Sequence, residues 1–250
     1  MKFVSFWLLL LMCLITVSQG MATSASAVVI QIRGEVDPVM ARYVERAIDL
    51  AVQRGARAVV IDIDTPGGRV DAALDISKAI MRTELPTVAV VTGQAWSAGA
   101  LIALSARNLF MFPGSAIGAA EPIPTTEKIV AAWRSAMEGA AEANGRDPRL
   151  AAAMVDRDVE IPGVIDRGKL LSLSSQPAVE QGLADGIVVD LAQAVRDANL
   201  GQVSLSVVDV STTEQLVRVL TGPVVSVVLL TLGLAGIIIE LTTVGFGVAG

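Results

Sequence analysis

The sequence predicts an α/β fold with a mostly parallel sheet, followed by a transmembrane segment. From Val28 onward, short runs rich in Val and Ile alternate with amphipathic helical patterns, which is typical of βαβ units. Turns that contain Gly or Pro separate these runs. The mean hydropathy of +0.62 is high for a soluble protein, so part of the 250-residue chain is expected in a membrane.

The composition narrows the chemistry that the chain can perform. The net charge is −6, from 25 acidic and 19 basic residues without a basic cluster, so nucleic acid is not expected as a partner. The single cysteine, Cys13, excludes a disulfide framework and a cysteine-ligated metal site. There are no histidines, which removes the commonest general base and the commonest zinc ligand. Proton transfer must use Lys, Asp, Glu or Tyr, and we expect no metal and no other cofactor.

Residues 1–27 are typical of a signal peptide. Lys2 precedes the apolar run 3–17, and small residues follow through Ala27. We expect cleavage between Gly20 and Ala27. An uncleaved N-terminal anchor is the alternative, because one lysine makes a short basic segment.

Two strands and two helices are predicted over residues 28–82. The first strand is 28–33. Asp37 and Pro38 then begin a helix that ends near Arg54, with Gly55 after it. The second strand, 58–64, ends at the turn 65–68. In the helix after this turn, four residues at helical spacing form the face expected to pack on the sheet: Val70, Leu74, Ser77 and Met81.

The pattern continues through residue 220 and then changes. The predicted elements are a strand at 87–91, a helix after Ser97, a strand at 108–112, helices at 125–144 and 148–156, a short helix ending at Gly182, a final strand, and a helix from Asp190. Run 223–239 is uncharged and rich in Val, Leu and Ile, so 221–250 is predicted to hold a transmembrane segment. A buried core helix is the alternative. Because the chain stops inside the Gly-rich GFGVAG, we expect either that the sequence is a fragment or that further membrane segments are missing.

Ser97 lies where a buried strand turns into a helix of small and aliphatic residues. A hydroxyl at such a junction projects beside the first free N–H groups of the helix, which suits a nucleophile next to an oxyanion site. The alternative is that Ser97 only caps the helix. Glycines of the neighbouring turn let backbone N–H groups approach a carbonyl, so Gly67 or Gly68 together with Ala98 are candidate oxyanion donors.

Without histidine, a serine nucleophile needs a lysine as its base. Only four lysines occur. Lys2 belongs to the signal, Lys78 is expected on a polar helix face, and Lys169 lies in a polar stretch. Lys128 has apolar neighbours in sequence, and desolvation favours the neutral amine that a base requires. A solvated lysine in a first helical turn is the alternative for Lys128. Two prolines and two threonines precede it, which predicts a poorly formed resting site.

Five motifs in this order resemble the ClpP-like serine protease domain. They are TPGG (65–68), SAG (97–99), PGSAIGAAEP (113–122), a helix-opening Lys128, and EQGLADGIV (180–188). With a signal segment ahead and ELTTVGFGVAG behind, the chain more closely resembles the membrane-bound NfeD proteases, which work beside stomatin-type proteins. The resemblance implies a ClpP/crotonase-like spiral over 28–220. It also implies that Ser97 is the nucleophile, that Lys128 is the base, and that the N–H groups of Gly68 and Ala98 are the oxyanion donors.

The expectation is therefore a membrane-tethered serine endopeptidase with a Ser-Lys dyad, whose protease domain lies on the extracytoplasmic side. By resemblance, its substrate is a peptide or an apolar segment of a membrane protein such as a stomatin-like partner, and it forms a homo-oligomer, a dimer or larger. Two alternatives come from other classes. One is a crotonase-type acyl-CoA enzyme, which shares the fold. The other is a catalytically idle membrane scaffold for a stomatin-like partner.

Overall fold

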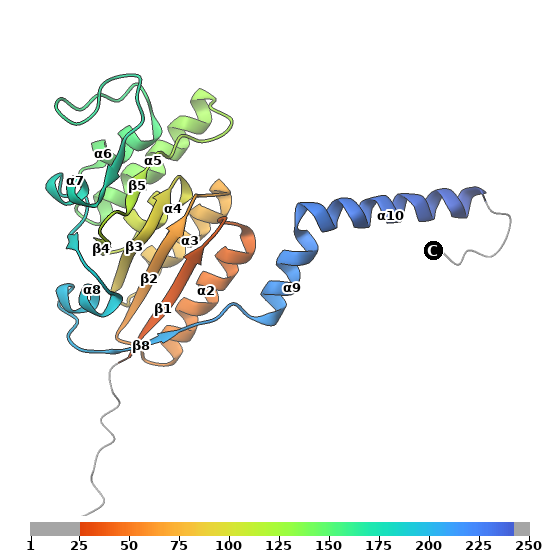
Figure 1. Cartoon of the computed structure of the whole chain (residues 1–250), viewed down its shortest axis with the longest axis horizontal. Helices are drawn as coiled ribbons and strands as arrows, with labels where there is room; N and C mark the ends of the chain where they lie inside the picture. The colour runs from red at the N-terminus through yellow and green to blue at the C-terminus, as the bar shows by residue number, and fades with distance from the viewer. Residues whose placement is uncertain (1–25, 243–250) are drawn as a thin grey trace, which may run out of the picture.

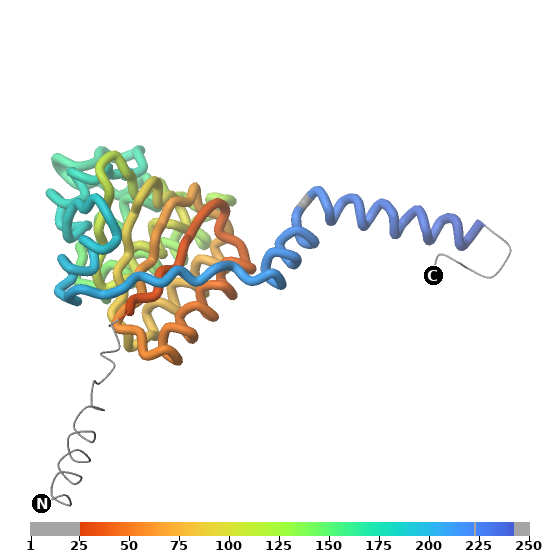
Figure 2. The backbone as a smooth tube through the Cα atoms, turned by 60° about the horizontal axis from the view of Figure 1, so that its bottom comes forward, coloured from red at the N-terminus to blue at the C-terminus, as the bar shows by residue number. Residues whose placement is uncertain are grey.

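The computed structural model describes residues 26–242 (Figure 1). The predicted signal peptide or anchor, apart from its last two residues, lies outside the described residues, and so does the end of the predicted membrane segment, 243–250. The described part forms an α/β body from which one long helix projects (Figures 1 and 2).

One sheet organises the described part of the chain. Its eight strands are β1 (Ser26–Arg33), β2 (Ala58–Thr65), β3 (Thr87–Trp96), β4 (Asn108–Met111), β5 (Ala116–Gly118), β6 (Ser172–Ser174), β7 (Gly186–Ile187) and β8 (Ser204–Val207). The order is β6-β5-β3-β2-β1-β8, with β4 between β3 and β7. All pairs are parallel except β5 with β6. The predicted α/β fold with a mostly parallel sheet is confirmed.

β3 is the branch point of the sheet. Its first half, Val88 to Val91, pairs with β4, and its last three residues, Gln94 to Trp96, pair with β5. The strand was predicted to stop at Val91. It continues to Trp96 because β5 provides a hydrogen-bonding partner for its last three residues. The extension carries the chain directly to Ser97.

Helices cover both faces of the sheet. They are α2 (Pro38–Gln53), α3 (Val70–Arg82), α4 (Ala98–Leu104), α5 (Glu127–Ala143), α6 (Pro148–Val155), α7 (Ser175–Glu180), α8 (Leu191–Asp197), α9 (Thr212–Thr221) and α10 (Pro223–Thr242). On β2, Ile61 and Ile63 join the large core under α2, α3 and α4, whereas Val60 joins a smaller core with Val195 of α8 (Figure 1). This alternation is the period of two expected for a strand that is buried on both faces.

The sequence predicted both ends of α2 correctly. The Asp37 carboxylate accepts a hydrogen bond from the Met40 N–H at 2.7 Å, Pro38 is the first residue of α2, and Gly55 follows the helix with φ 63°. The predicted cap, first-turn proline and terminal glycine of α2 are therefore confirmed.

The packing face predicted for α3 was wrong, because the buried face is rotated about the helix axis relative to it. Met81 is 46% exposed, and Val70 and Leu74 are only partly buried. The buried face consists of Ala72, Ala73, Ile76, Ser77 and Ile80. Ile76 and Ile80 lie one turn apart and fill the core, and small Ala72 and Ala73 allow α3 to approach α2 and α4 closely.

Three short strands were not predicted. β5 pairs with the end of β3, and β6 pairs antiparallel with β5. β8 adds to the edge of the sheet beside β1, so the strand at 186–187 is not the final one. Each has at most four residues, so the alternation of polar and apolar residues in β6 and β8 is too short to identify a strand. Their pairing depends on long-range contacts that local patterns do not reveal.

α10 projects away from the body (Figure 2). Its segment Val224–Thr242 has a mean hydropathy of 2.5, and none of it is buried within the structure. The alternative of a buried core helix is therefore wrong. By length and composition, this helix is able to cross a membrane.

Candidate active site

Ser97 is held in a strained backbone conformation between β3 and α4. Its φ of 51° and ψ of −117° lie outside the regions that residues with a side chain favour. It occupies the cap position of α4, yet its side chain makes no capping hydrogen bond, so a simple capping role does not account for this residue. Its N–H donates to the Gly118 carbonyl at 3.1 Å. A hydroxyl on a sharp strand-to-helix turn, free of local bonds, is the arrangement of a nucleophile.

The turns 65–68 and 97–99 interlock. A Cβ added at Gly67 would lie 2.6 Å from the Ser97 Cβ, and one at Gly99 would lie 2.6 Å from the Thr65 Cγ2. Real side chains do not approach so closely, so both glycines are required by the contact itself. The structure thus brings together the two glycine-containing turns that the sequence placed at the carboxyl edge of the sheet.

Two residues that the sequence interpretation missed hold the first turn in place. The buried Thr65 hydroxyl donates to the Gly34 carbonyl at 2.5 Å and accepts from the Gly67 N–H at 3.0 Å. Val36 donates its N–H to the Gly67 carbonyl at 2.8 Å and accepts from the Arg69 N–H at 2.8 Å. Thr65 belongs to the TPGG motif and was therefore detectable, whereas Val36 depends on a strand-like bridge to Gly68 that only the fold creates.

The candidate oxyanion donors differ in availability. The Gly67 N–H is bonded to Thr65 Oγ1. Within residues 26–242, the N–H groups of Gly68 and Ala98 donate to no acceptor. A Cβ at Gly68 would lie 2.2 Å from the Val36 carbonyl oxygen, so this position also requires glycine. Of the two glycines considered from the sequence, Gly68 is the one with a donor available for a substrate carbonyl.

Lys128 lies near the start of α5, and its side chain is exposed. In the part of the chain that the structure describes, it has no hydrogen bond or ion pair, including none to Ser97. The expected apolar surroundings of Lys128 are absent from this conformation, because Trp133 turns into the core and donates its indole N–H to the Ala120 carbonyl at 2.8 Å instead. The loop ahead is also exposed, with Ile123 at 95%. These findings agree with the predicted poorly formed resting site.

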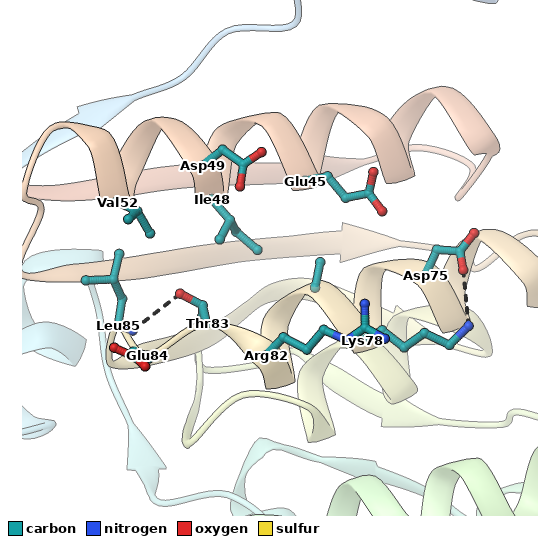
Figure 3. Close-up of a pocket in the computed structure, with 11 residues that line it drawn as sticks. Glu45, Ile48, Asp49, Val52, Asp75, Lys78, Arg82, Thr83, Glu84 and Leu85 are labelled. Atoms are coloured by element: carbon teal, nitrogen blue, oxygen red, sulfur yellow. Dashed lines mark hydrogen bonds and ion pairs between the residues drawn. The ribbon is translucent and has the colours of Figure 1, made fainter.

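The other two described lysines are paired with acids. Lys78 contacts Asp75 at 3.3 Å, and Lys169 contacts Asp166 at 2.7 Å. Figure 3 shows Lys78 on α3, at a hollow between α2 and α3 that also carries Glu45 and Asp49. None of the residues around Ser97 line this hollow. Both lysines are exposed, as the sequence predicted, and each forms a local ion pair with an acid three residues before it.

A second polar cluster lies on the opposite side of the same strands. Asp62, which is buried, pairs with Arg33 and accepts a hydrogen bond from the Thr92 hydroxyl at 2.7 Å. The neighbouring Asp64 carboxylate accepts from the Gln94 N–H at 3.1 Å. The charges of this cluster are satisfied internally. No group of three or more His, Cys, Asp or Glu residues suited to a metal ion occurs within residues 26–242.

Comparison with known proteins places these features in a family. The membrane protein NfeD1b of Bacillus subtilis is 34% identical over 235 residues, which is 92% of this chain and 54% of that protein. The membrane-bound protease PH1510 of Pyrococcus horikoshii is 28% identical over 249 residues, which is 88% of this chain and 54% of that protein. The chain thus spans about half the length of the curated relatives it matches.

Solved structures of similar fold include those of 1510-N. The Pyrococcus horikoshii 1510-N membrane protease, specific for a stomatin homolog, aligns with a TM-score of 0.64 at 25% identity, covering 80% of this chain and 100% of that one. A lysine-to-alanine variant of 1510-N bound to a substrate peptide aligns with a TM-score of 0.69 at 24% identity, covering 80% and 99%. The second likeness supports the fold alone.

The model of the NfeD1b N-terminal domain matches residues 26–208, which include all eight strands of the sheet and exclude α9 and α10. The resemblance to the NfeD proteins that the motifs indicated is therefore confirmed. The chain belongs to the NfeD1b N-terminal domain family.

Proposed function

We propose that this protein is a membrane-tethered serine endopeptidase with Ser97 as its nucleophile and Lys128 as its base. One observation carries the proposal: Ser97 is held in a strained conformation, and among the described residues 26–242 neither its hydroxyl nor two backbone N–H groups in the adjoining turns make a hydrogen bond. Strain that the surrounding structure maintains is characteristic of functional sites. Among the relatives, PH1510 is described as a membrane-bound protease, which supports the same class of activity.

In the proposed mechanism, Lys128 takes the proton of Ser97 Oγ as this oxygen attacks a peptide carbonyl. The N–H groups of Gly68 and Ala98 stabilise the oxyanion, and the protonated Lys128 gives its proton to the leaving amine. Water, activated in turn by Lys128, then hydrolyses the acyl-enzyme. Because Lys128 is exposed and unpaired before substrate binds, substrate binding must bring it to Ser97.

The finer assignments belong to the same proposal. We infer a signal peptide or anchor over 1–27, a protease domain of the ClpP-like kind over 28–220, and a membrane segment over 221–250, with the protease domain on the extracytoplasmic side. The substrate is an apolar segment of a membrane protein such as a stomatin-like partner, by analogy with the stated specificity of 1510-N. The chain acts as a homo-oligomer, in which Lys128 serves its own Ser97 or that of a neighbour.

Cleavage of casein and of apolar peptides by the full chain in proteoliposomes tests the proposal. The matched variants are Ser97→Ala, Lys128→Ala and, as a control, Lys78→Ala, which changes an exposed lysine outside the site. We expect the first two to lower kcat/KM by about 1,000-fold or more and the control to keep parental activity. Cleavage by Ser97→Ala at the parental rate would refute the proposal.

The idle scaffold is the alternative with an observation in its favour, because Lys128 makes no bond to Ser97 in this structure. It predicts no cleavage by the parent protein, and capture of a stomatin-like partner that survives the double replacement of Ser97 and Lys128. Turnover of acyl-thioesters that survives Ser97→Ala would instead favour the acyl-CoA enzyme.

A further inference from the structure

The juxtamembrane helix α9 presents its charged side to the protein and its apolar side to the surroundings. Three apolar side chains are largely exposed: Leu216 at 57%, Val219 at 59% and Leu220 at 46%. They recur at spacings of three and four residues, so they share one face of the helix. In a helix that packs on a water-soluble domain, this polarity is normally reversed, and an outward apolar face marks a surface for another apolar partner.

The opposite side of α9 is attached to α2 by two ion pairs. Arg46 donates to both carboxylate oxygens of Glu214 at 2.8 and 2.7 Å, and Arg218 donates to both oxygens of Asp37 at 3.1 and 3.3 Å. Glu214 and Arg218 lie one turn apart, on the side of α9 away from Leu216 and Leu220. These contacts fix the rotation of α9, so its apolar face points away from α2.

The position of α9 in the chain indicates what covers this face. Gly222 has extended backbone angles, φ −61° and ψ 144°, and α10 begins at Pro223. The chain bends between α9 and α10 in both views (Figures 1 and 2). When α10 crosses a bilayer, α9 therefore lies along its surface rather than along its normal. An amphipathic helix in that position buries its apolar face at the boundary of head groups and acyl chains.

We propose that α9 is an interfacial helix whose face of Leu216, Val219 and Leu220 inserts into the lipid surface. The partner is the bilayer itself, because this face is continuous in sequence with the exposed apolar helix Val224–Thr242. The two ion pairs then transmit the orientation of α9 to the domain. The protein is then held to the membrane by α9 as well as by α10. This inference does not depend on protease activity.

Fluorophores at single cysteines on α9 test the proposal in the full chain, reconstituted into phosphatidylcholine and phosphatidylglycerol vesicles. Cys13→Ser removes the natural cysteine, and Leu216→Cys or Leu220→Cys then places the probe on the proposed lipid face. Gln215→Cys is the matched control, since this exposed polar residue lies on the same helix but outside that face. Quenching is measured with doxyl-labelled lipids and with aqueous iodide.

We expect doxyl lipids to quench the probes at 216 and 220 at least twofold more than the probe at 215, and iodide to show the reverse order. Equal access of iodide to all three probes would overturn the proposal. Protection at 216 and 220 that disappears when each vesicle holds no more than one chain would overturn it as well, because a second copy would then cover the face. Protection that persists at one chain per vesicle supports the lipid surface.

Discussion

The two members of the proposed dyad lie in very different surroundings. Ser97 is held by its neighbours. Gly67 lies against its Cβ, and the Gly118 carbonyl accepts a hydrogen bond from its N–H. The Thr65 hydroxyl accepts a hydrogen bond from the Gly67 N–H in the adjoining turn. Lys128 has no bonding partner within residues 26–242, and the cap residue of its helix, Thr126, makes no capping bond either. One half of the candidate site is preformed, and the other half is not.

The helix that carries Lys128 shows the same contrast along its own length. Trp133 and Met137 are buried, and past the end of α5 the Asn144 amide donates to the Leu104 carbonyl at 2.9 Å. In the first turn of α5, Val130 is only partly buried against the core, and Glu127 and Lys128 are exposed. α5 is therefore anchored most firmly at its far end, whereas the Lys128 side chain lies exposed at its start. In the proposed mechanism, a bound substrate orders the loop before α5 and brings Lys128 to Ser97.

The largest expected effect is on the preformed half. Gly67→Ala places a Cβ 2.6 Å from the Ser97 Cβ at a φ of 109°, so the serine or the turn must move. We expect kcat/KM for peptide cleavage to fall by about 100-fold or more, since small displacements of reacting groups cost that much. Gly139→Ala, at a helical position where a Cβ meets nothing within 4 Å, is the control. Parental activity in Gly67→Ala would show that Ser97 does not depend on this contact.

The next effect concerns the anchored end of α5. Arg146 is buried, and its guanidinium donates to the carbonyls of Leu183 and Ala106, each at 2.9 Å, and lies 3.5 Å from Asp185. Arg146→Lys keeps a charge but cannot satisfy these partners. We expect a loss of about 3 kcal/mol in the free energy of unfolding, measured by urea denaturation.

Arg149→Lys, three residues away and exposed, is the control and should change that free energy by less than about 0.5 kcal/mol. Equal stability of the two variants would mean that the far end of α5 is not fixed by Arg146.

A smaller effect measures the strain at Ser97. The angles φ 51° and ψ −117° suit glycine, whereas alanine retains the steric conflict. Both Ser97→Gly and Ser97→Ala should be inactive. We expect the glycine variant to be more stable than the alanine variant by about 1 kcal/mol, after allowance for the greater freedom of unfolded glycine. Equal unfolding free energies, compared by thermal and urea denaturation, would show that Ser97 is unstrained.

The smallest effect lies outside the site and depends on pH. The hydrogen bond from Arg46 lowers the pKa of Glu214 to about 2 from its ordinary value of 4.5. Because the folded pKa is lowered, this pair stabilises the attachment of α9 fully above about pH 4.5 and progressively loses that effect as pH falls toward 2. Amide exchange in α9 of the full chain should accelerate relative to α2 in this window.

Glu214→Gln should show the faster exchange already at neutral pH and little further change on acidification. The exchange of residues 65–68 should stay slow throughout, because Thr65 and Val36 hold that turn without help from α9. Acceleration there in parallel with α9 would mean that the preformed half depends on the membrane-proximal helix.

The contrast also explains what the sequence was able to predict. Asp37, Pro38 and Gly55 act through local backbone chemistry, so the ends of α2 followed from the sequence. The branched β3 and the short β5, β6 and β8 depend on strands distant in sequence, so they did not follow from it. The rotation of α3 was missed because alanines rather than the larger Met81 face the core.

The candidate site divides in the same way. Ser97 and the glycine turns were predictable, because tight turns restrict which residues fit. The bridge of Val36 to Gly68 required the fold. The surroundings of Lys128 were not predictable from its apolar sequence neighbours. Trp133 is buried in the core, and Ile129 and Val130 are only partly buried. A residue whose partner arrives with the substrate leaves no local packing signal.

The central claim, that substrate binding brings Lys128 to Ser97, is tested most directly by the reactivity of its amine. The Ser97→Ala full chain is treated with an amine-acetylating reagent, with and without a saturating apolar peptide, and acetylation is quantified by mass spectrometry. Lys78 and Lys169, both exposed and away from the site, serve as internal controls. We predict that the peptide lowers acetylation of Lys128 severalfold and leaves the controls unchanged. Acetylation of Lys128 that is unaffected by bound peptide would contradict the account.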